Sequence, residues 1–253
     1  MAEDLNKRSV ILSALKVFEV LELLAGHNPA SLTEIAKMTG FSKSNTQRIL
    51  NTLCAASYVR QDEDSLKYRP TIKLYSLGST ILRQDAVRLA AHPHLLKLQE
   101  QFNETVNLGI LDRDSILYLD KIVSKSPLRV ELELGSKVPV YCSGLGKAIS
   151  AFHKTPPVPD NFTSYTVNTV GSQAEFEKQL AKIREQGYAL DAEEYVEGLI
   201  CIAVPILHKH TEPVAAVSIS IPKIRFQEGN VPNYVAALQD CAQGLAEALY
   251  QKI

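Results

Sequence analysis

The sequence predicts a two-domain α+β protein with a winged helix-turn-helix domain in front. The chain has 253 residues, more than a single hydrophobic core usually holds, so two domains are expected. Its first 78 residues read as helices followed by a hairpin, whereas strands and helices mix after Pro93. A hydrophobic content of 45% and a charged content of 22% are typical of soluble globular proteins.

The first predicted helix covers residues 9–25, with Ser9 as N-cap and Gly26 at its end. The stretch SLTE at 31–34 has the form of a capping box and starts a short second helix, which Thr39-Gly40 stops. Ser42 then caps a third helix within residues 42–59. The apolar spacing of this helix puts one set of side chains on its inner side: Ile49, Leu50, Leu53 and Ala56.

A hairpin is predicted next, with strands at Tyr58-Val59 and at residues 67–69 around the acidic loop QDEDS. Residues 72–90 read as one helix that ends before His92-Pro93. The predicted organisation is therefore a winged helix-turn-helix domain over residues 1–78, a linker helix over 79–91 and an α+β domain over 92–253.

The second domain begins with an amphipathic helix after Pro93 and has a proline-rich loop near 152–165. Its remaining helices are predicted at 146–152, 173–186 and 232–251. Its strands are predicted at 106–111, 116–123, 128–134, 199–206 and 213–221, in a sheet that is largely antiparallel.

The third helix has a polar face without negative charge, since no Asp or Glu occurs from Phe41 to Gln61. A winged helix-turn-helix has the order helix, glycine turn, polar helix and hairpin. Its second helix, which here is the polar third helix of the chain, enters the DNA major groove. Arg, Asn and Gln pair with base edges, and Lys and Ser hold phosphates. An ordinary surface helix that lacks acids is the alternative. The predicted DNA contacts are Ser42, Lys43, Ser44, Asn45, Gln47, Arg48, Asn51, Arg60, Lys67 and Arg69.

The whole chain resembles the IclR family of bacterial transcriptional regulators. The resemblance rests on SLTEIAKMTGFSKSNTQRILNTL, ETVNLGILD, LGSKVPVYCSGLGKA, REQGYALDAEE, EGLICIAVP and AAVSISIP, in family order from about Val10 to Leu249. It implies a GAF-like or profilin-like C-terminal domain that binds a small metabolite, often an organic or sugar acid. The segments IAVPI, SISIPKIRF and LKYRPTIKLYSLG look most like regulators of pectin-derived sugar-acid breakdown.

The SGLG stretch at 143–146 offers backbone N–H groups before a helix, which suits a carboxylate. Ser218 and Ser220 alternate along one strand, so their hydroxyls face the same side. Each residue also has a plainer interpretation: Cys201 as core, the serines as a solvent face, Asp191 as surface charge. By resemblance, the effector-binding residues are Val130, Gly144, Leu145, Asp191, Cys201, Ser218 and Ser220.

The sequence also departs from the family pattern. Ile200 stands where an Arg is usual, and Ala192 replaces a common second Asp. The region 152–165 is shorter than usual and lacks a helix, and the third helix reads KSNTQR. The identity of the effector and the operator sequence are therefore not carried over from the family.

Several classes of protein are disfavoured. Four scattered cysteines indicate free thiols, with no disulfide framework and no metal site. There is no G-x-S-x-G, and Tyr141 occupies the first glycine position of a would-be P-loop, so neither an enzyme nor a cofactor is predicted. No apolar run is long enough to span a bilayer and no secretion signal is evident, so a cytoplasmic protein without a membrane partner is expected.

The net charge of −1 gives no global attraction to a polyanion, although residues 1–78 carry +2 and the remainder −3. The predicted function is a DNA-binding transcriptional repressor of a catabolic operon, controlled by a small organic or sugar acid. Its predicted partners are a double-stranded operator, the carboxylated metabolite and further copies of the chain, as homodimer or homotetramer. The alternative is an enzyme that binds or metabolises a sugar acid or keto acid and carries an accessory domain of DNA-binding type.

Overall fold

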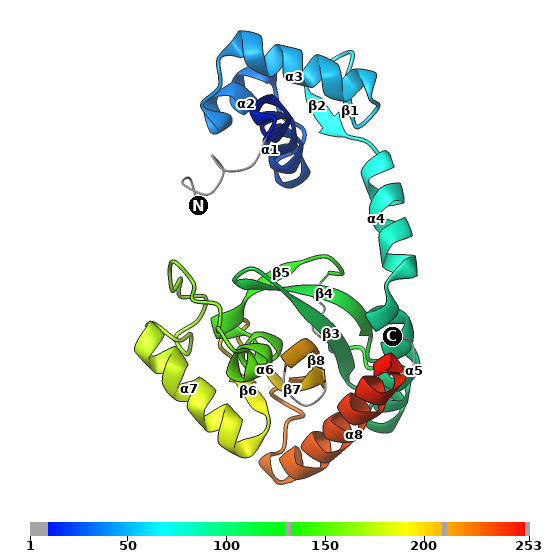
Figure 1. Cartoon of the computed structure of the whole chain (residues 1–253), viewed down its shortest axis with the longest axis vertical. Coiled ribbons are helices and arrows are strands. Elements are labelled where there is room, and N and C mark those ends of the chain that lie inside the picture. Colours follow the sequence, from blue (N-terminus) through cyan, green and yellow to red (C-terminus); the bar gives the residue numbers. More distant parts are fainter. Residues whose placement is uncertain (1–9, 130–132, 209–211, 251–253) are drawn as a thin grey trace. The chain divides into compact units, whose positions relative to one another are not determined.

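The computed structural model describes residues 10–129, 133–208 and 212–250, which fall into two compact units (Figure 1). The N-terminal unit ends at Leu82 and the C-terminal unit begins at Arg83. Each unit has a hydrophobic cluster of its own. Within the described ranges, no helix has the length and apolar character needed to cross a membrane.

The N-terminal unit consists of three helices and a two-stranded hairpin. The elements are α1 (Leu12–Gly26), α2 (Leu32–Thr39), α3 (Lys43–Ala55), β1 (Val59–Gln61) and β2 (Tyr68–Pro70). Val20 and Leu24 of α1, Ile35 of α2 and Leu50 of α3 are fully buried and meet in one core, with Tyr68 of the hairpin. The structure thus confirms the predicted winged helix-turn-helix order.

The predicted caps of α2 and α3 are also confirmed. The Ser31 hydroxyl accepts from the Glu34 amide, and the Glu34 carboxylate accepts from the Ser31 amide at 2.7 Å, which completes the capping box. Gly40 ends α2 with φ of +71°, a left-handed conformation that glycine adopts without a steric penalty. The Ser42 hydroxyl accepts from the Asn45 amide and so starts α3.

Two details of the first helices differ from the prediction. Helix α1 begins at Leu12 with Ile11 at its N-cap position and no side-chain cap, and Ser9 lies outside the described residues. Ala56 is exposed because α3 ends one residue earlier. Thr46 takes the fourth buried place, since 46, 49, 50 and 53 follow the i, i+3, i+4, i+7 spacing of one helix face.

The single helix predicted over 72–90 is wrong. Two helices replace it, α4 (Lys73–Gln84) and α5 (Ala86–Phe102), and the Asp85 carboxylate between them caps α5 by accepting from the Arg88 amide at 2.8 Å. Pro93 lies inside α5 and does not end it. A proline inside a helix costs about 3 kcal/mol, but each fully buried leucine contributes roughly 1.5–3 kcal/mol, so burial of Leu95 and Leu98 offsets it.

The C-terminal unit is built on a six-stranded sheet in the order β5-β4-β3-β8-β7-β6, with every neighbouring pair antiparallel. Helix α6 (Gly144–Phe152) packs on one face with α7 (Gln173–Gln186) against it, and α5 and α8 (Val231–Tyr250) pack together at the sheet (Figure 1). The α+β class is confirmed. The strands are β3 (Thr105–Asp112), β4 (Ser115–Ile122), β5 (Lys137–Pro139), β6 (Ala189–Ala192), β7 (Leu199–His208) and β8 (Glu212–Pro222).

The predicted strand at 128–134 is not confirmed. Residues 130–132 lie outside the described residues, and those on either side of them are not in a strand. The short strands β5 and β6 were not predicted, because three or four residues are too few to show an alternating pattern. Residues 153–172 contain neither helix nor strand, in agreement with the prediction of a loop around 152–165.

Candidate functional site

The polar face of α3 lies opposite its buried face. Ser44, Gln47, Arg48 and Asn51 share this face by helical geometry, and of these only Gln47 is half-buried. Ser42 and Lys43 are exposed at the start of the helix, where the first amides of the helix also lie. The face therefore presents donors and a cation, with no carboxylate on the helix.

Gln47 and Asn51, two of the residues predicted to contact DNA, are hydrogen-bonded to each other. The Gln47 side-chain amide donates to the Asn51 carbonyl oxygen at 2.9 Å and to the Tyr68 hydroxyl at 3.2 Å. These bonds use both N–H groups of Gln47 and tie α3 to the hairpin. Gln47 keeps its carbonyl oxygen as an acceptor, and Asn51 keeps its amide N–H groups as donors. The pair thus behaves as one preorganised unit.

The hairpin carries its cations on its strands and its acids at the tip. Arg60 of β1 pairs directly with Arg69 of β2, so the two side chains emerge on one side of the hairpin, and Lys67 is half-buried just before β2. The sequence did not single out Lys16 of α1, which lines a surface hollow together with Asn45 and Arg48. In the sequence, this lysine looks like any exposed lysine on an amphipathic helix. Its position beside the polar face of α3 becomes apparent only in the folded structure.

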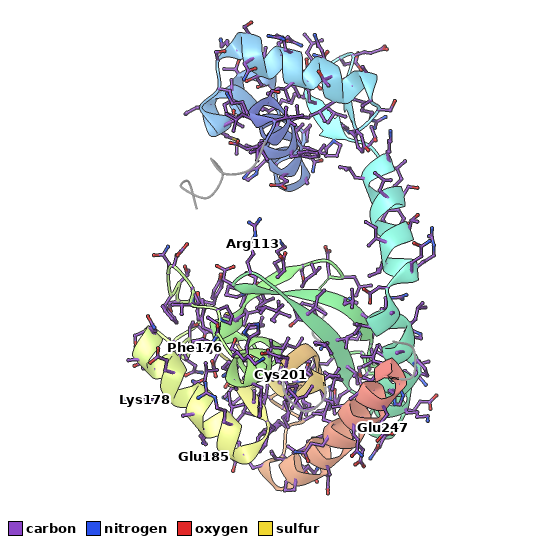
Figure 2. All side chains as sticks on the ribbon, in the orientation of Figure 1. Arg113, Phe176, Lys178, Glu185, Cys201 and Glu247 are labelled. Atoms are coloured by element: carbon purple, nitrogen blue, oxygen red, sulfur yellow. The ribbon has the colours of Figure 1, made fainter. Side chains whose placement is uncertain are left out.

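In the C-terminal unit, the register of the sheet brings four predicted effector residues together. Asp191 pairs with Cys201, and Cys201 pairs with Ser220, so the three lie in one row across β6, β7 and β8. Ser218 lies two residues from Ser220 and therefore on the same face. All four side chains are buried, and Figure 2 shows Cys201 inside the C-terminal unit. The Cys201 sulfur lies 3.2 Å from the Ser220 hydroxyl oxygen.

The first turn of α6 covers this row. Ser143 caps the helix through a 3.0 Å bond from the Gly146 amide, and a Cβ at Gly144 would lie 3.4 Å from Ala203 and from the Cys201 carbonyl oxygen. The first amides of a helix have no acceptor inside it, so those of Gly144 and Leu145 suit an anion. The Leu145 side chain is buried in the core, so only its backbone is available to a ligand. Val130 lies outside the described residues.

A buried charge cluster that the sequence did not reveal adjoins the row. The Lys147 ammonium pairs with the Glu194 carboxylate and donates to the Leu190 carbonyl oxygen at 2.6 Å, although only 1% of Lys147 is exposed. The Asp191 carboxylate accepts from the Glu194 amide at 2.8 Å. Burial raises the pKa of Asp191 from 3.8 to about 7, against the opposing effect of Lys147. Burial also raises the pKa of the Cys201 thiol, which stays protonated.

Asn107 of β3 is a second residue that the sequence did not single out. It pairs with Ser218 across β3 and β8, and its side-chain amide lies 3.0 Å from the Ser220 hydroxyl. The available signal was a polar residue between apolar neighbours at an inward position of a strand, in VNLGI. Asn107 therefore extends the polar row by one strand.

The raised pKa of Asp191 predicts a pH-dependent stability. The unfolded chain releases this proton near pH 4 and the folded chain near pH 7, so the free energy of unfolding falls as pH rises between these values. At 1.36 kcal/mol per pH unit the upper bound is about 4 kcal/mol. Asp191→Asn keeps an oxygen for the Glu194 amide and should remove this slope. Urea unfolding at pH 5 and pH 8 checks it, and parallel pH profiles for variant and wild type would contradict it.

Comparison with known proteins gives consistent matches for both units. Residues 79–247 match the family model "Bacterial transcriptional regulator IclR C-terminal", and residues 13–63 match the "IclR helix-turn-helix domain". The chain is 36% identical to the HTH-type transcriptional regulator KdgR of Dickeya chrysanthemi, over 97% of this chain and 83% of that protein.

Two solved structures are similar over nearly the whole chain. The IclR structure of Thermotoga maritima matches with a TM-score of 0.70 and 31% identity, covering 94% of this chain and 98% of that one. An IclR homolog of Microbacterium hydrocarbonoxydans, complexed with 4-hydroxybenzoate, matches with a TM-score of 0.75 and covers 94% and 99%. At 22% identity, this second match supports the fold alone.

Proposed function

The chain belongs to the IclR family of bacterial transcriptional regulators, and from that membership we propose that it represses a catabolic operon until a small organic or sugar acid binds the C-terminal unit. One observation carries the effector half of this proposal. Asp191, Cys201, Ser218 and Ser220 form a buried row of hydrogen-bonding groups against the first turn of a helix. Burying a polar group costs free energy unless the group is hydrogen-bonded, so a purely structural core does not require such a row.

In the proposed complex with DNA, α3 lies in the major groove. Arg48, Asn51 and Asn45 face base edges, with Gln47 held by Asn51. Ser42, Lys43, Ser44, Arg60, Lys67 and Arg69 contact phosphates, which position the unit without reading sequence. The acids at the hairpin tip, Asp62 to Asp64, would be repelled by phosphates, so the strands and not the tip approach the backbone.

In the proposed complex with an acid, the carboxylate lies between the Ser218 and Ser220 hydroxyls and the amides of Gly144 and Leu145. Asp191 lies at the other end of the row, where an ionised carboxylate would repel the ligand's own charge. It is therefore better placed to accept from a ligand hydroxyl. Sugar acids carry both groups, and the resemblance to regulators of sugar-acid breakdown makes them the first class to test.

We further propose that the protein works in the cytoplasm as a homodimer or homotetramer. Helix α4 buries none of its residues in this chain and leaves Ile72, Tyr75 and Ile81 more than two-thirds exposed on and beside it. Apolar surface of this kind is typical of contacts between chains. Paired units would read half-sites that are separated by whole helical turns, about 34 Å each.

The enzyme alternative has no support. The matched family model and the relatives compared above are transcriptional regulators, and this chain is one as well.

A thermal-shift screen with keto acids, sugar acids and aromatic acids tests the effector half. The acid that raises the Tm of the wild type most should lose on the order of 10- to 100-fold in affinity in Ser220→Ala, because a hydrogen bond to a charged group is lost. Ser65→Ala, in the hairpin loop of the N-terminal unit, is a serine control that should bind the acid normally. An unchanged affinity in Ser220→Ala would contradict the proposed site.

A further inference from the structure

Asn107 makes contacts that define the direction of the hydrogen bonds in the polar row. Only 4% of its surface is exposed, and it projects from β3 on the face that carries Ser218 and Ser220. Its side-chain amide nitrogen donates to the Ser220 hydroxyl at 3.0 Å and to the Ser218 hydroxyl at 3.4 Å. One side chain thus addresses both predicted ligand-binding hydroxyls.

A serine hydroxyl has one hydrogen to donate and two lone pairs to accept with. Because Asn107 fills a lone pair on each serine, each hydroxyl hydrogen must turn toward another acceptor. The Cys201 sulfur lies 3.2 Å from Ser220 but is a weak acceptor while the thiol is protonated. The two hydroxyls are therefore free to donate to an acceptor supplied by a ligand.

The first turn of α6 adds two further donors. The amides of Gly144 and Leu145 in the first turn of α6 have no acceptor in the helix, and Gly144 packs directly on Cys201. A ligand group between the hydroxyls and these amides would meet donors from both sides. Such a group must accept hydrogen bonds, as a carboxylate does and as an amine or amide nitrogen does not.

We propose that Asn107 is a specificity-determining residue of the effector site, which selects a carboxylate over neutral or donor groups by fixing Ser218 and Ser220 as donors. This inference rests on the proposed function, in which the C-terminal unit binds an acid. It adds a residue on a strand that the predicted site did not include, and a reason why the site discriminates between an acid and its amide.

Asn107→Asp tests the inference with a side chain of nearly the same shape. A carboxylate at this position accepts and does not donate, so it takes both serine hydrogens and repels an acid. The probes are pyruvate, D-gluconate and 4-hydroxybenzoate, each beside its primary amide, with isothermal titration calorimetry on the full chain. The acid that binds the wild type should lose on the order of 100-fold in affinity, because it loses bonds to a charged group. Its amide should change by no more than about threefold, since the amide nitrogen supplies the hydrogens that the serines lose.

Asn233→Asp on α8 is the matched control, because Asn233 is exposed and the change in net charge is the same. It should bind like the wild type. If Asn107→Asp does not fold, Asn107→Ala replaces it, and the ratio of acid to amide affinity should fall about tenfold as the hydroxyls become free to rotate.

The outcomes separate the two levels of the proposal. If no acid binds the wild type, the proposed acid effector is wrong and this inference is overturned with it. If an acid binds the wild type and Asn107→Asp weakens acid and amide equally, or neither, Asn107 has no selective role and the inference alone is overturned.

Discussion

Replacing Lys147 with Met is expected to destabilise the C-terminal unit by about 3–5 kcal/mol, because it leaves a buried carboxylate without its cation. Lys147 is 1% exposed and satisfies both Glu194 and the Leu190 carbonyl oxygen. The second oxygen of Glu194 is already buried without a hydrogen-bond partner, so the carboxylate has no other group to turn to. For a unit of this size the Tm should fall by roughly 10 °C.

The double variant Lys147→Met, Glu194→Leu distinguishes the effect of losing the ion pair from the effect of losing side-chain packing. Replacing both partners of a buried ion pair by apolar groups of similar volume is often neutral or stabilising. We therefore expect most of the lost stability to return. Differential scanning calorimetry of the full chain measures both variants, with the transition of the N-terminal unit as internal reference. A single variant that costs less than about 1 kcal/mol, or a double variant no better than the single, would contradict this account.

Lys147 and Glu194 also show what the sequence could not reveal. Lysine and glutamate are almost always exposed, so GLGKA and DAEEY read as an ordinary helix surface and an acidic turn. Only the tertiary fold, which packs α6 on the sheet and brings β6 beside β7, places both residues in the interior. The residues of the polar row were predictable by resemblance, because family motifs preserve spacing along the chain. Asn107 lies within one of these motifs, but its partners are 111 and 113 residues away.

The boundaries of helices were likewise predictable where nearby residues determine them, and not where tertiary packing does. Ser31, Gly40 and Ser42 act within their own turns, so the capping residues of α2 and α3 were predicted correctly. The break at Asp85 and the continuation through Pro93 depend on burial of α5 against the rest of the C-terminal unit, which local preference does not encode. The order of the three N-terminal helices and the hairpin was predictable for the same reason as the caps.

Arg48→Glu is expected to weaken binding to the preferred duplex on the order of 100-fold or more. The substitution removes the proposed base contact, worth about 1–3 kcal/mol, and places the first carboxylate on an exposed helix face that has none. Lys178→Glu on α7 makes the same change in charge on an exposed side chain of the C-terminal unit (Figure 2). That control should bind within about threefold of the wild type, since it lies outside the proposed contacts. The duplex is the one the wild type selects from a random pool, and fluorescence anisotropy measures the affinity.

Two milder variants divide the face into base and phosphate contacts. Arg48→Ala should relax the preference at one base position, whereas Lys43→Ala should weaken all duplexes alike and reduce the salt slope by about 1. Identical behaviour of the two variants on every duplex would show that α3 does not read bases as proposed.

The most direct measurement is a footprint of the full chain on its selected duplex, at low salt, with and without the acid that stabilises it. We expect a protected stretch long enough for two half-sites, and a shift of occupancy when the acid is added, corresponding to a coupling of about 1–3 kcal/mol. Ser220→Ala should protect the same stretch and lose the response to the acid. Absence of protection under every condition, or protection that no acid alters, would contradict this expectation.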